Sequence, residues 1–144
     1  MTAKEMWERF SREMGIDDAF EAWAFGDASD ELADLVYRGI KTGTSSAYPL
    51  YALEGEPIPE AGDYSVILNS REEAVCIIRN RAVTVLPYKA VTEEMAFKEG
   101  EGDRTLAYWR QVHERFFTGC MEENGLSFDE EMLVVYEEFE RVYG

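Results

Sequence analysis

The sequence predicts an α+β fold, in which helices surround a curled sheet of mixed or antiparallel strands. Segments rich in β-branched residues follow one another in the middle of the chain with only short turns between them, which is typical of such strands. Segments with apolar residues at helical spacing precede and follow them, and one more strand-like segment ends the chain. With 144 residues and no internal repeat, residues 1–144 are expected to form a single domain.

The N-terminal third of the chain predicts two helices with a short strand between them. Apolar residues recur at helical spacing over residues 3–14, and Gly15 is a suitable stop for this helix. Residues 19–25 alternate aromatic with small or polar residues, which favours a short strand. Ser29 is expected to cap a second helix, and Gly39 lies where the end of that helix favours a left-handed residue.

The middle of the chain predicts two strands. Residues 63–69 and 74–86 are rich in β-branched residues, and residues 70–73 are expected to join them in a hairpin-like turn. Residues 54–62 form a connector rich in proline and glycine, too short to separate two domains. Residues 44–53 fit either a strand or a helix, although a proline within them argues against an uninterrupted helix.

The C-terminal third predicts two helices and a last strand. The first helix begins at Thr92 and stops near Gly100, where a glycine-spaced acidic turn covers residues 99–104. A long amphipathic helix follows from Thr105. Residues 132–142 predict the final strand, in which charged residues alternate with apolar ones.

Composition narrows the classes of protein to which the chain can belong. The net charge of −16 argues against a broad footprint on nucleic-acid phosphates, because such binding needs many Lys and Arg contacts. It leaves room for a small basic pocket that reads one nucleotide. No apolar run approaches membrane-spanning length, the N-terminus lacks the pattern of a secretory signal, and Cys76 and Cys120 form no disulfide framework. We therefore expect a cytoplasmic protein that contacts no membrane.

The stretch from Gly39 to Ser46 combines a lysine with four hydroxyl side chains, a mixture that core packing does not require. Lys41 and Thr44 stand three residues apart, so a lysine amine could accept the proton of an attacking hydroxyl. The same groups, with Ser45 and Ser46, could instead bind an anion or a base, or they could form an ordinary loop after a helix. The glycine pattern excludes a Walker loop. All three readings stay open at this point.

The acidic turn at residues 99–104 is the predicted counterpart of this loop. Glu99, Glu101 and Asp103 alternate with two glycines, so their backbone could approach a ligand closely. Their carboxylates could hold Lys41 charged, accept hydrogen bonds from a base, or simply cap the following helix. The spacing of a calcium loop is absent, and we predict neither a metal nor another cofactor.

Four further side chains are candidate ligand contacts. His113 is the one histidine, and it is either a core residue of its helix or a proton shuttle. Trp109 could stack on a base or fill the core. Arg79 and Arg104 could contact phosphate, face solvent or pair with the acidic turn.

These motifs resemble those of the ASCH domain family, which belongs to the PUA-like β-barrel superfamily. The segment Gly39–Thr44 is similar to the family's Gly-x-Lys signature. Residues 99–104, followed by Trp109 and His113, resemble a second signature of stand-alone bacterial ASCH proteins. The resemblance extends from about Trp23 to Tyr143, so residues 1–15 are expected to be an extra N-terminal helix outside the common core.

The resemblance implies a PUA-like β-barrel with surrounding helices and a cleft lined by the Gly-x-Lys loop. The family is associated with RNA, and some members resemble small amidohydrolases that remove the acetyl group of N4-acetylcytidine. The catalytic lysine, threonine and glutamate of those enzymes fall on Lys41, Thr44 and Glu99. Where they carry an arginine shortly after the threonine, this chain has residues 45–47, Ser-Ser-Ala. Other members resemble single-strand ribonucleases.

Three functions follow from these expectations. The first is a hydrolase that acts on a modified nucleoside or on RNA through Lys41, Thr44 and Glu99. The second is a non-catalytic module that binds RNA or a nucleotide and has a regulatory role. The third is a protein-interaction domain whose acidic surface meets a basic partner. The ligand predicted for the first two is a nucleoside, a nucleotide or a short single-stranded RNA, and no oligomeric state is predicted.

Overall fold

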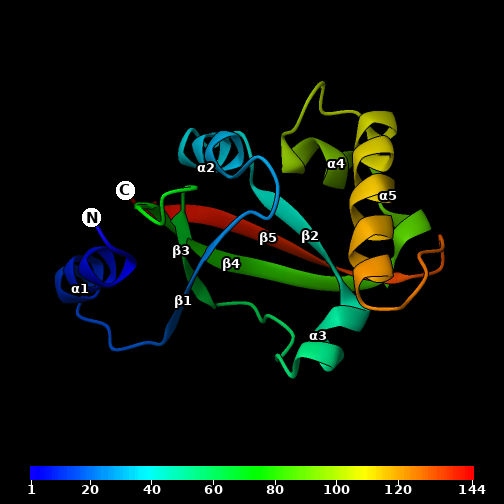
Figure 1. Ribbon diagram of the computed structural model, residues 1–144. Helices are drawn as coiled ribbons and strands as arrows, with labels where there is room; N and C mark the ends of the chain where they lie inside the picture. Colours follow the sequence, from blue (N-terminus) through cyan, green and yellow to red (C-terminus); the bar gives the residue numbers. More distant parts are fainter.

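The computed structural model describes residues 1–144 and has the predicted α+β fold, with five strands joined in one sheet (Figure 1). In chain order the elements are α1 (Ala3–Met14), β1 (Phe20–Ala24), α2 (Ser29–Tyr37), β2 (Gly43–Ala47), α3 (Tyr48–Glu54), β3 (Tyr64–Leu68), β4 (Ala74–Pro87), a 3-10 turn (Tyr88–Ala90), α4 (Glu93–Glu99), α5 (Leu106–Glu123) and β5 (Leu133–Tyr143). None of the helices combines the length and hydropathy needed to cross a bilayer.

The sheet is mixed and curled into a half-barrel. Its strand order is β1-β3-β4-β5-β2, with β1 parallel to β3 and every other neighbouring pair antiparallel. The pairing of β4 with β5 shifts register twice, between Ile77 and Ile78 and between Asn80 and Ala82, and such irregularities bend and twist a strand. Since β1 and β2 lie at opposite edges of the sheet, each keeps one side without a strand partner.

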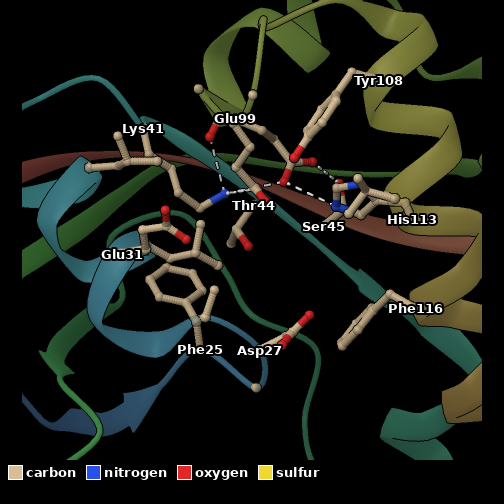
Figure 2. A pocket seen from close by; sticks show the side chains of 18 of the residues that line it. Phe25, Asp27, Glu31, Lys41, Thr44, Ser45, Glu99, Tyr108, His113 and Phe116 are labelled. Carbon is tan, nitrogen blue, oxygen red and sulfur yellow. Dashed lines mark hydrogen bonds and ion pairs between the residues drawn. The ribbon is translucent and has the colours of Figure 1, made fainter.

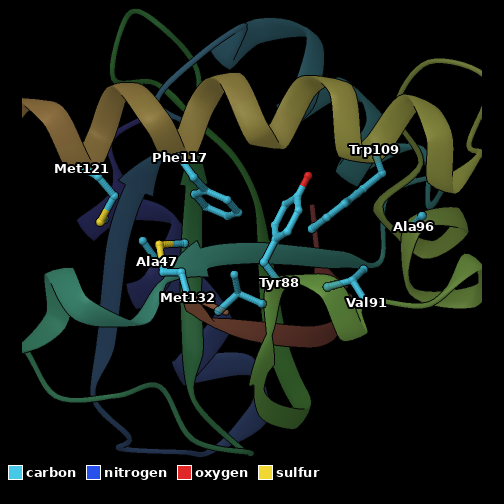
Figure 3. Packing of buried hydrophobic residues seen from close by; sticks show 9 residues of the cluster. Ala47, Tyr88, Val91, Ala96, Trp109, Phe117, Met121 and Met132 are labelled. Atoms are coloured by element: carbon cyan, nitrogen blue, oxygen red, sulfur yellow. The ribbon is translucent and has the colours of Figure 1, made fainter. Parts of the chain in front are cut away.

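Three apolar clusters attach the helices to this sheet. α1 packs on β3 and β4 through Trp7 and Phe10, and α2 packs on β3 and β4 through Val36. The long helix α5 places Trp109 and Phe117 against Tyr88, as Figure 3 shows, and this packing fixes α5 above β2 and β5. The helices α2, α4 and α5 therefore gather around one end of β2 (Figure 1).

The structure confirms the predicted helices and strands and resolves the segment that the sequence left open. Residues 44–53 divide into most of strand β2 and most of helix α3, and the proline lies in the first turn of α3, where a helix needs no N–H donor.

The predicted cap of α2 is wrong by one residue. Ala28 caps this helix in a left-handed conformation, with φ of 50°, and it supplies no capping side chain. Ser29 already has a place in the helix, and its hydroxyl donates back to the Phe25 carbonyl at 2.6 Å. Because the tight turn after β1 places Ser29 inside the first turn of α2, its hydroxyl bonds a preceding carbonyl and does not cap the helix.

Candidate functional site

The backbone brings the loop after α2 against the end of α4. Gly39, with φ of 75°, reverses the chain after α2, and the Thr42 amide then donates to the Lys98 carbonyl at 2.7 Å. Gly100 has φ of 73°, and a Cβ there would lie 2.6 Å from the Ile40 carbonyl oxygen. Only glycine allows this approach, so the predicted juxtaposition of loop and acidic turn depends on Gly100.

Lys41 extends from this loop into the protein and is almost fully buried, with 1% exposure. Its Nζ donates to the backbone carbonyl of Glu99 at 3.3 Å, to Glu99 Oε1 at 3.3 Å and to Glu101 Oε2 at 2.9 Å. It also lies 5.4 Å from the centre of the Phe25 ring. Two carboxylates and a carbonyl thus accept from the three protons of the Lys41 ammonium group.

Glu99 is the centre of the site. Its Oε2 accepts hydrogen bonds from the Ser45 hydroxyl at 2.5 Å and the Trp109 indole at 2.6 Å, and its Oε1 lies 3.5 Å from His113 Nε2. Burial opposes ionisation, but the charge of Lys41 and the bonds from His113 and Ser45 outweigh it and lower the pKa of Glu99 to about 2. Glu99 is therefore a fixed anion at neutral pH.

His113 lies beside Glu99 and stacks on Trp109, with ring centroids 4.2 Å apart. Its Nδ1 lies 2.9 Å from the Trp109 carbonyl, which can only accept, so Nδ1 bears a proton. Burial would lower the pKa of His113, but the hydrogen bond and charge of Glu99, helped by Glu101, raise it above its ordinary value. Gaining a second proton at Nε2 converts the ring to a cation facing Glu99.

These residues form the floor of a cavity of about 670 Å³, within the usual range of small-molecule sites (Figure 2). One wall comes from the turn after β1 and from α2, and the other comes from α5. Besides the floor residues, the lining includes Phe25, Asp27, Glu31, Thr44, Tyr108 and Phe116.

Thr44 and Ser45 both line the cavity although their side chains point to opposite faces of β2. The cavity therefore borders the free edge of β2 and not one of its two faces. Phe139 donates to the Thr42 carbonyl. By strand alternation the backbone groups of Thr44 then point toward β5, and the backbone N–H of Ser45 points to the free side. The Thr44 hydroxyl makes no hydrogen bond within the chain, unlike that of Ser45.

Comparison with known proteins identifies the fold and the family. The family model described as the ASCH domain matches residues 21–143, most of the chain. The chain belongs to the ASCH domain family. This family is PUA-like and associated with RNA binding, as the resemblance of the two sequence signatures implied.

Two solved structures resemble this ASCH domain over nearly its whole length. The ASCH domain from Lactobacillus crispatus JV V101 is 32% identical with a TM-score of 0.90, over 98% of this chain and 94% of that one. Protein EF3133 from Enterococcus faecalis V583, of family DUF984, is 34% identical with a TM-score of 0.91, over 97% of this chain and 87% of that one.

A more distant structure shares the fold alone. Hypothetical protein PH0355 is 15% identical with a TM-score of 0.59, and the match covers 86% of this chain and all of that one. A comparison with curated proteins gives no match.

The ASCH structure brings together six of the predicted site residues. Lys41, Glu99, Glu101 and His113 surround one another on the floor of the cavity, with Thr44 and Ser45 beside them. Trp109 touches Glu99 from behind the floor and does not line the cavity. Its ring is 3% exposed and packs in the core, so its face is not available to stack on a base.

Four predicted contacts lie outside the cavity. The Ser46 hydroxyl pairs with the Tyr51 hydroxyl, because Ser46 points away from Glu99 on the alternating strand β2. Arg79 lies over the Tyr64 ring, far along the sheet. Asp103 accepts hydrogen bonds from the amide and hydroxyl of Thr105 at the start of α5, so it belongs to the turn there.

Arg104 has a structural role at the end of α4. Its guanidinium lies over the Phe97 ring at 3.6 Å and donates to the carbonyls of Phe97 and Ile40. It thus joins the acidic turn to the Lys41 loop from outside. The glycines of the turn likewise approach protein atoms: Gly100 packs against Ile40, and a Cβ at Gly102 would lie 2.4 Å from the Tyr108 ring.

The sequence reasoning missed most of the cavity walls. Phe25, Asp27 and Glu31 come from the turn after β1 and from α2, and Tyr108 and Phe116 come from α5. One signal was present: Tyr108, Val112 and Phe116 recur every four residues and so form a second apolar stripe on α5, beside the stripe that faces the core. Without knowing what α5 faces, that stripe cannot be distinguished from the core stripe.

The floor also contains a possible set of metal ligands. Ligand atoms of Glu99, Glu101 and His113 all lie within 4.8 Å of one another. However, the Lys41 ammonium already contacts both carboxylates, so a metal ion here would have to displace it.

Proposed function

We propose that this ASCH protein binds a nucleoside, or an unpaired base of a short RNA, and hydrolyses an acyl amide on the base, as the N4-acetylcytidine amidohydrolases do. The observation that supports this most directly is the position of Thr44. Its free hydroxyl lines a cavity of nucleoside-binding size, beside the buried Lys41–Glu99 pair. The three residue types match the lysine, threonine and glutamate of those enzymes.

In the proposed reaction the Thr44 oxygen attacks the acyl carbon while the amine form of Lys41 takes the hydroxyl proton. The backbone N–H of Ser45, on the free side of β2, donates to the oxyanion. The carbon–nitrogen bond then breaks, and Lys41 returns the proton to the leaving nitrogen. Water hydrolyses the Thr44 ester, which releases the carboxylic acid and restores the hydroxyl.

The amine form of Lys41 requires one proton transfer before the attack. Glu101 is the suitable acceptor, because its side chain is 18% exposed whereas Glu99 is held ionised. A ligand that fills the cavity removes water and so disfavours the ion pair relative to the neutral pair. In this scheme ligand binding itself activates Lys41.

The test compares Thr44→Ala with Thr44→Ser on N4-acetylcytidine and a panel of other acylated nucleosides. Thr44 bonds no other side chain, so neither change should disturb the fold. We expect Thr44→Ala to lower the rate of cytidine release at least about a thousandfold and Thr44→Ser to retain part of it. Normal turnover by Thr44→Ala, or no turnover by the wild-type protein on any substrate, would overturn the amidohydrolase proposal.

A non-catalytic ligand-binding module is the second candidate. One observation favours it: all three ammonium protons of Lys41 are engaged by Glu99 and Glu101, which suits a structural cation better than a base. In that case nucleosides or short RNAs would bind in the cavity without being cleaved. The same samples should be assayed with a short single-stranded RNA, because RNA cleavage dependent on Lys41 would instead indicate a ribonuclease.

A further inference from the structure

The charges around the cavity are unusual for a site in an RNA-associated fold. Acidic residues outnumber basic ones among the lining residues: the acids are Asp27, Glu31, Asp34, Glu99 and Glu101, and the bases are Arg38, Lys41 and Arg115, with His113. The chain as a whole has a net charge of −16, so the overall charge of the protein has the same sign as this excess.

Two of the three cations that line the cavity form ion pairs with neighbouring acids. Lys41 is shared by two carboxylates and has no proton left to donate. Arg38 pairs with Asp34 at 3.5 Å. Arg115 is the one lining cation without an ion pair, and it is exposed. A phosphate entering the cavity would therefore find few free donors.

Asp27 and Glu31 are the acids without an ion pair. Figure 2 shows both on the side of the cavity near Phe25, across from Ser45 and His113. Both are exposed at the wall and mouth of the cavity, so water surrounds them until a ligand arrives. Their carboxylates can accept hydrogen bonds from amino groups and repel phosphate.

The opposite wall is apolar and rigidly placed. Tyr108, Val112 and Phe116 stand one turn apart on α5 and form a ridge about 12 Å long. The Tyr108 ring packs against Gly102, which fixes its position. Tyr108 and Phe116 are 36% and 39% exposed, whereas the core-facing Trp109 of the same helix is 3% exposed. This ridge offers a flat ring a surface on which to pack.

We propose that these two walls make the cavity selective for phosphate-free aromatic ligands, that is, neutral or positively charged nucleosides and bases. The ring lies on the Tyr108–Phe116 ridge, and Asp27 and Glu31 accept its amino or hydroxyl groups and exclude phosphate. This inference rests on the cavity being the ligand site of the proposed function, but it requires no catalysis. Asp27, Glu31 and Phe116 become specificity residues that neither sequence signature contains.

The test measures binding by titration calorimetry or ligand-observed NMR, with cytidine, N4-acetylcytidine, adenosine and the 5′-monophosphates of cytidine and adenosine. At 20 mM salt, wild-type protein should bind each nucleoside at least about tenfold more tightly than its monophosphate. Asp27→Asn with Glu31→Gln should tighten monophosphate binding about fivefold or more, and 0.5 M salt should shrink this gain. Phe116→Ala should weaken all ligands about fivefold or more, and Phe116→Leu less.

A matched control separates the local effect from net charge. Glu13→Gln with Asp18→Asn removes the same two charges near α1, at the far end of the molecule from α5 (Figure 1), and should leave the selectivity unchanged. Equal binding of nucleosides and monophosphates by the wild-type protein, or an equal shift in the control, would overturn the inference while leaving the cavity as the site. Failure of every ligand to bind would overturn both this inference and the proposed function.

Discussion

The Nζ of Lys41 lies 3.3 Å from Oε1 of Glu99, and both side chains are 1% exposed. The two residues are 58 positions apart in the chain, so the fold and not local structure brings them together. A buried ion pair often stabilises a protein no more than two apolar residues in its place would. Removing one partner alone is costly, however, because the other charge is then buried without a counter-charge. The pair is therefore better explained by a role in the site than by stability.

Replacing one member of this pair should cost far more than replacing both. Lys41→Met leaves Glu99 buried without its ammonium and should lower the free energy of unfolding by about 3–5 kcal/mol. Adding Glu99→Gln to Lys41→Met should recover most of that loss, since a neutral amide can keep the bonds from Ser45 and Trp109. Urea unfolding of Lys41→Met, of Glu99→Gln and of the double variant measures the coupling. Additive losses would show that the pair is not energetically linked.

The same reasoning affects how catalysis is tested. A loss of activity in Lys41→Ala alone could come from an unfolded site, because Glu99 would then lack its partner. Thr44 is the cleaner position, and the Lys41→Met, Glu99→Gln double variant is the folded control.

Gly100 should tolerate no side chain. A Cβ would collide with the Ile40 carbonyl and the residue has φ of 73°, so Gly100→Ala meets both a clash and a strained conformation. Gly55 has φ of 67° with nothing within 4 Å of a Cβ, which makes Gly55→Ala a measure of the strain alone. We expect about 1–2 kcal/mol of destabilisation for Gly55→Ala and at least about 1–3 kcal/mol more for Gly100→Ala. Equal losses of unfolding free energy would mean that the turn shifts freely away from Ile40.

His113 should make the stability of the protein depend on pH. Its folded-state pKa is raised above the ordinary value of 6.5, so its contribution is fully present below pH 6.5 and is lost as the pH rises through the folded value. His113→Gln lacks this titration. The free energy of unfolding of the wild-type protein should therefore exceed that of His113→Gln by most near pH 6, and this difference should shrink by pH 9. Chemical unfolding at several pH values measures it, and a pH-independent difference would contradict a charged His113–Glu99 contact.

The pairing of the two motifs was predictable from the sequence because its signals are local. Gly39 and Gly100 mark helix ends, and polar residues without a core role follow both, so two loops with complementary charge could be matched. The β-branched runs likewise specified β3 and β4.

The predicted contacts that lie outside the cavity depend on the direction of a side chain, which local sequence does not specify. Ser45 and Ser46 are adjacent serines with similar sequence neighbours. Strand alternation directs the Ser45 side chain to Glu99 and the Ser46 side chain to Tyr51. The position of Arg79 follows from the order of strands in the sheet, because the register of β4 with β3 places Arg79 over Tyr64. The walls at Asp27 and Phe116 come from elements whose mutual packing no local pattern encodes.

Glu137 is a second buried carboxyl, and no cation neutralises it. It lies opposite Thr44 in the pairing of β2 with β5 and accepts one hydrogen bond, from the Asn80 amide at 3.3 Å. Burial raises its pKa to about 7, the Asn80 bond opposes that shift, and the nearby charges of Glu21 and Asp63 add to it. The carboxyl is therefore protonated in the folded protein across a range in which it ionises in the unfolded chain.

Glu137→Gln should consequently stabilise the protein at alkaline pH. A raised folded pKa creates a penalty that is absent below the ordinary value of 4.5, grows as the pH rises and is complete above pH 7. The variant should exceed the wild-type free energy of unfolding by about 2–3 kcal/mol at pH 8 and match it near pH 4.5, because glutamine keeps an acceptor for Asn80. Glu130→Gln, at an exposed position, is the control for the loss of one negative charge. Urea unfolding at both pH values decides the matter, and a variant less stable than wild type at pH 8 would mean that the Glu137 carboxylate is stabilised in the fold.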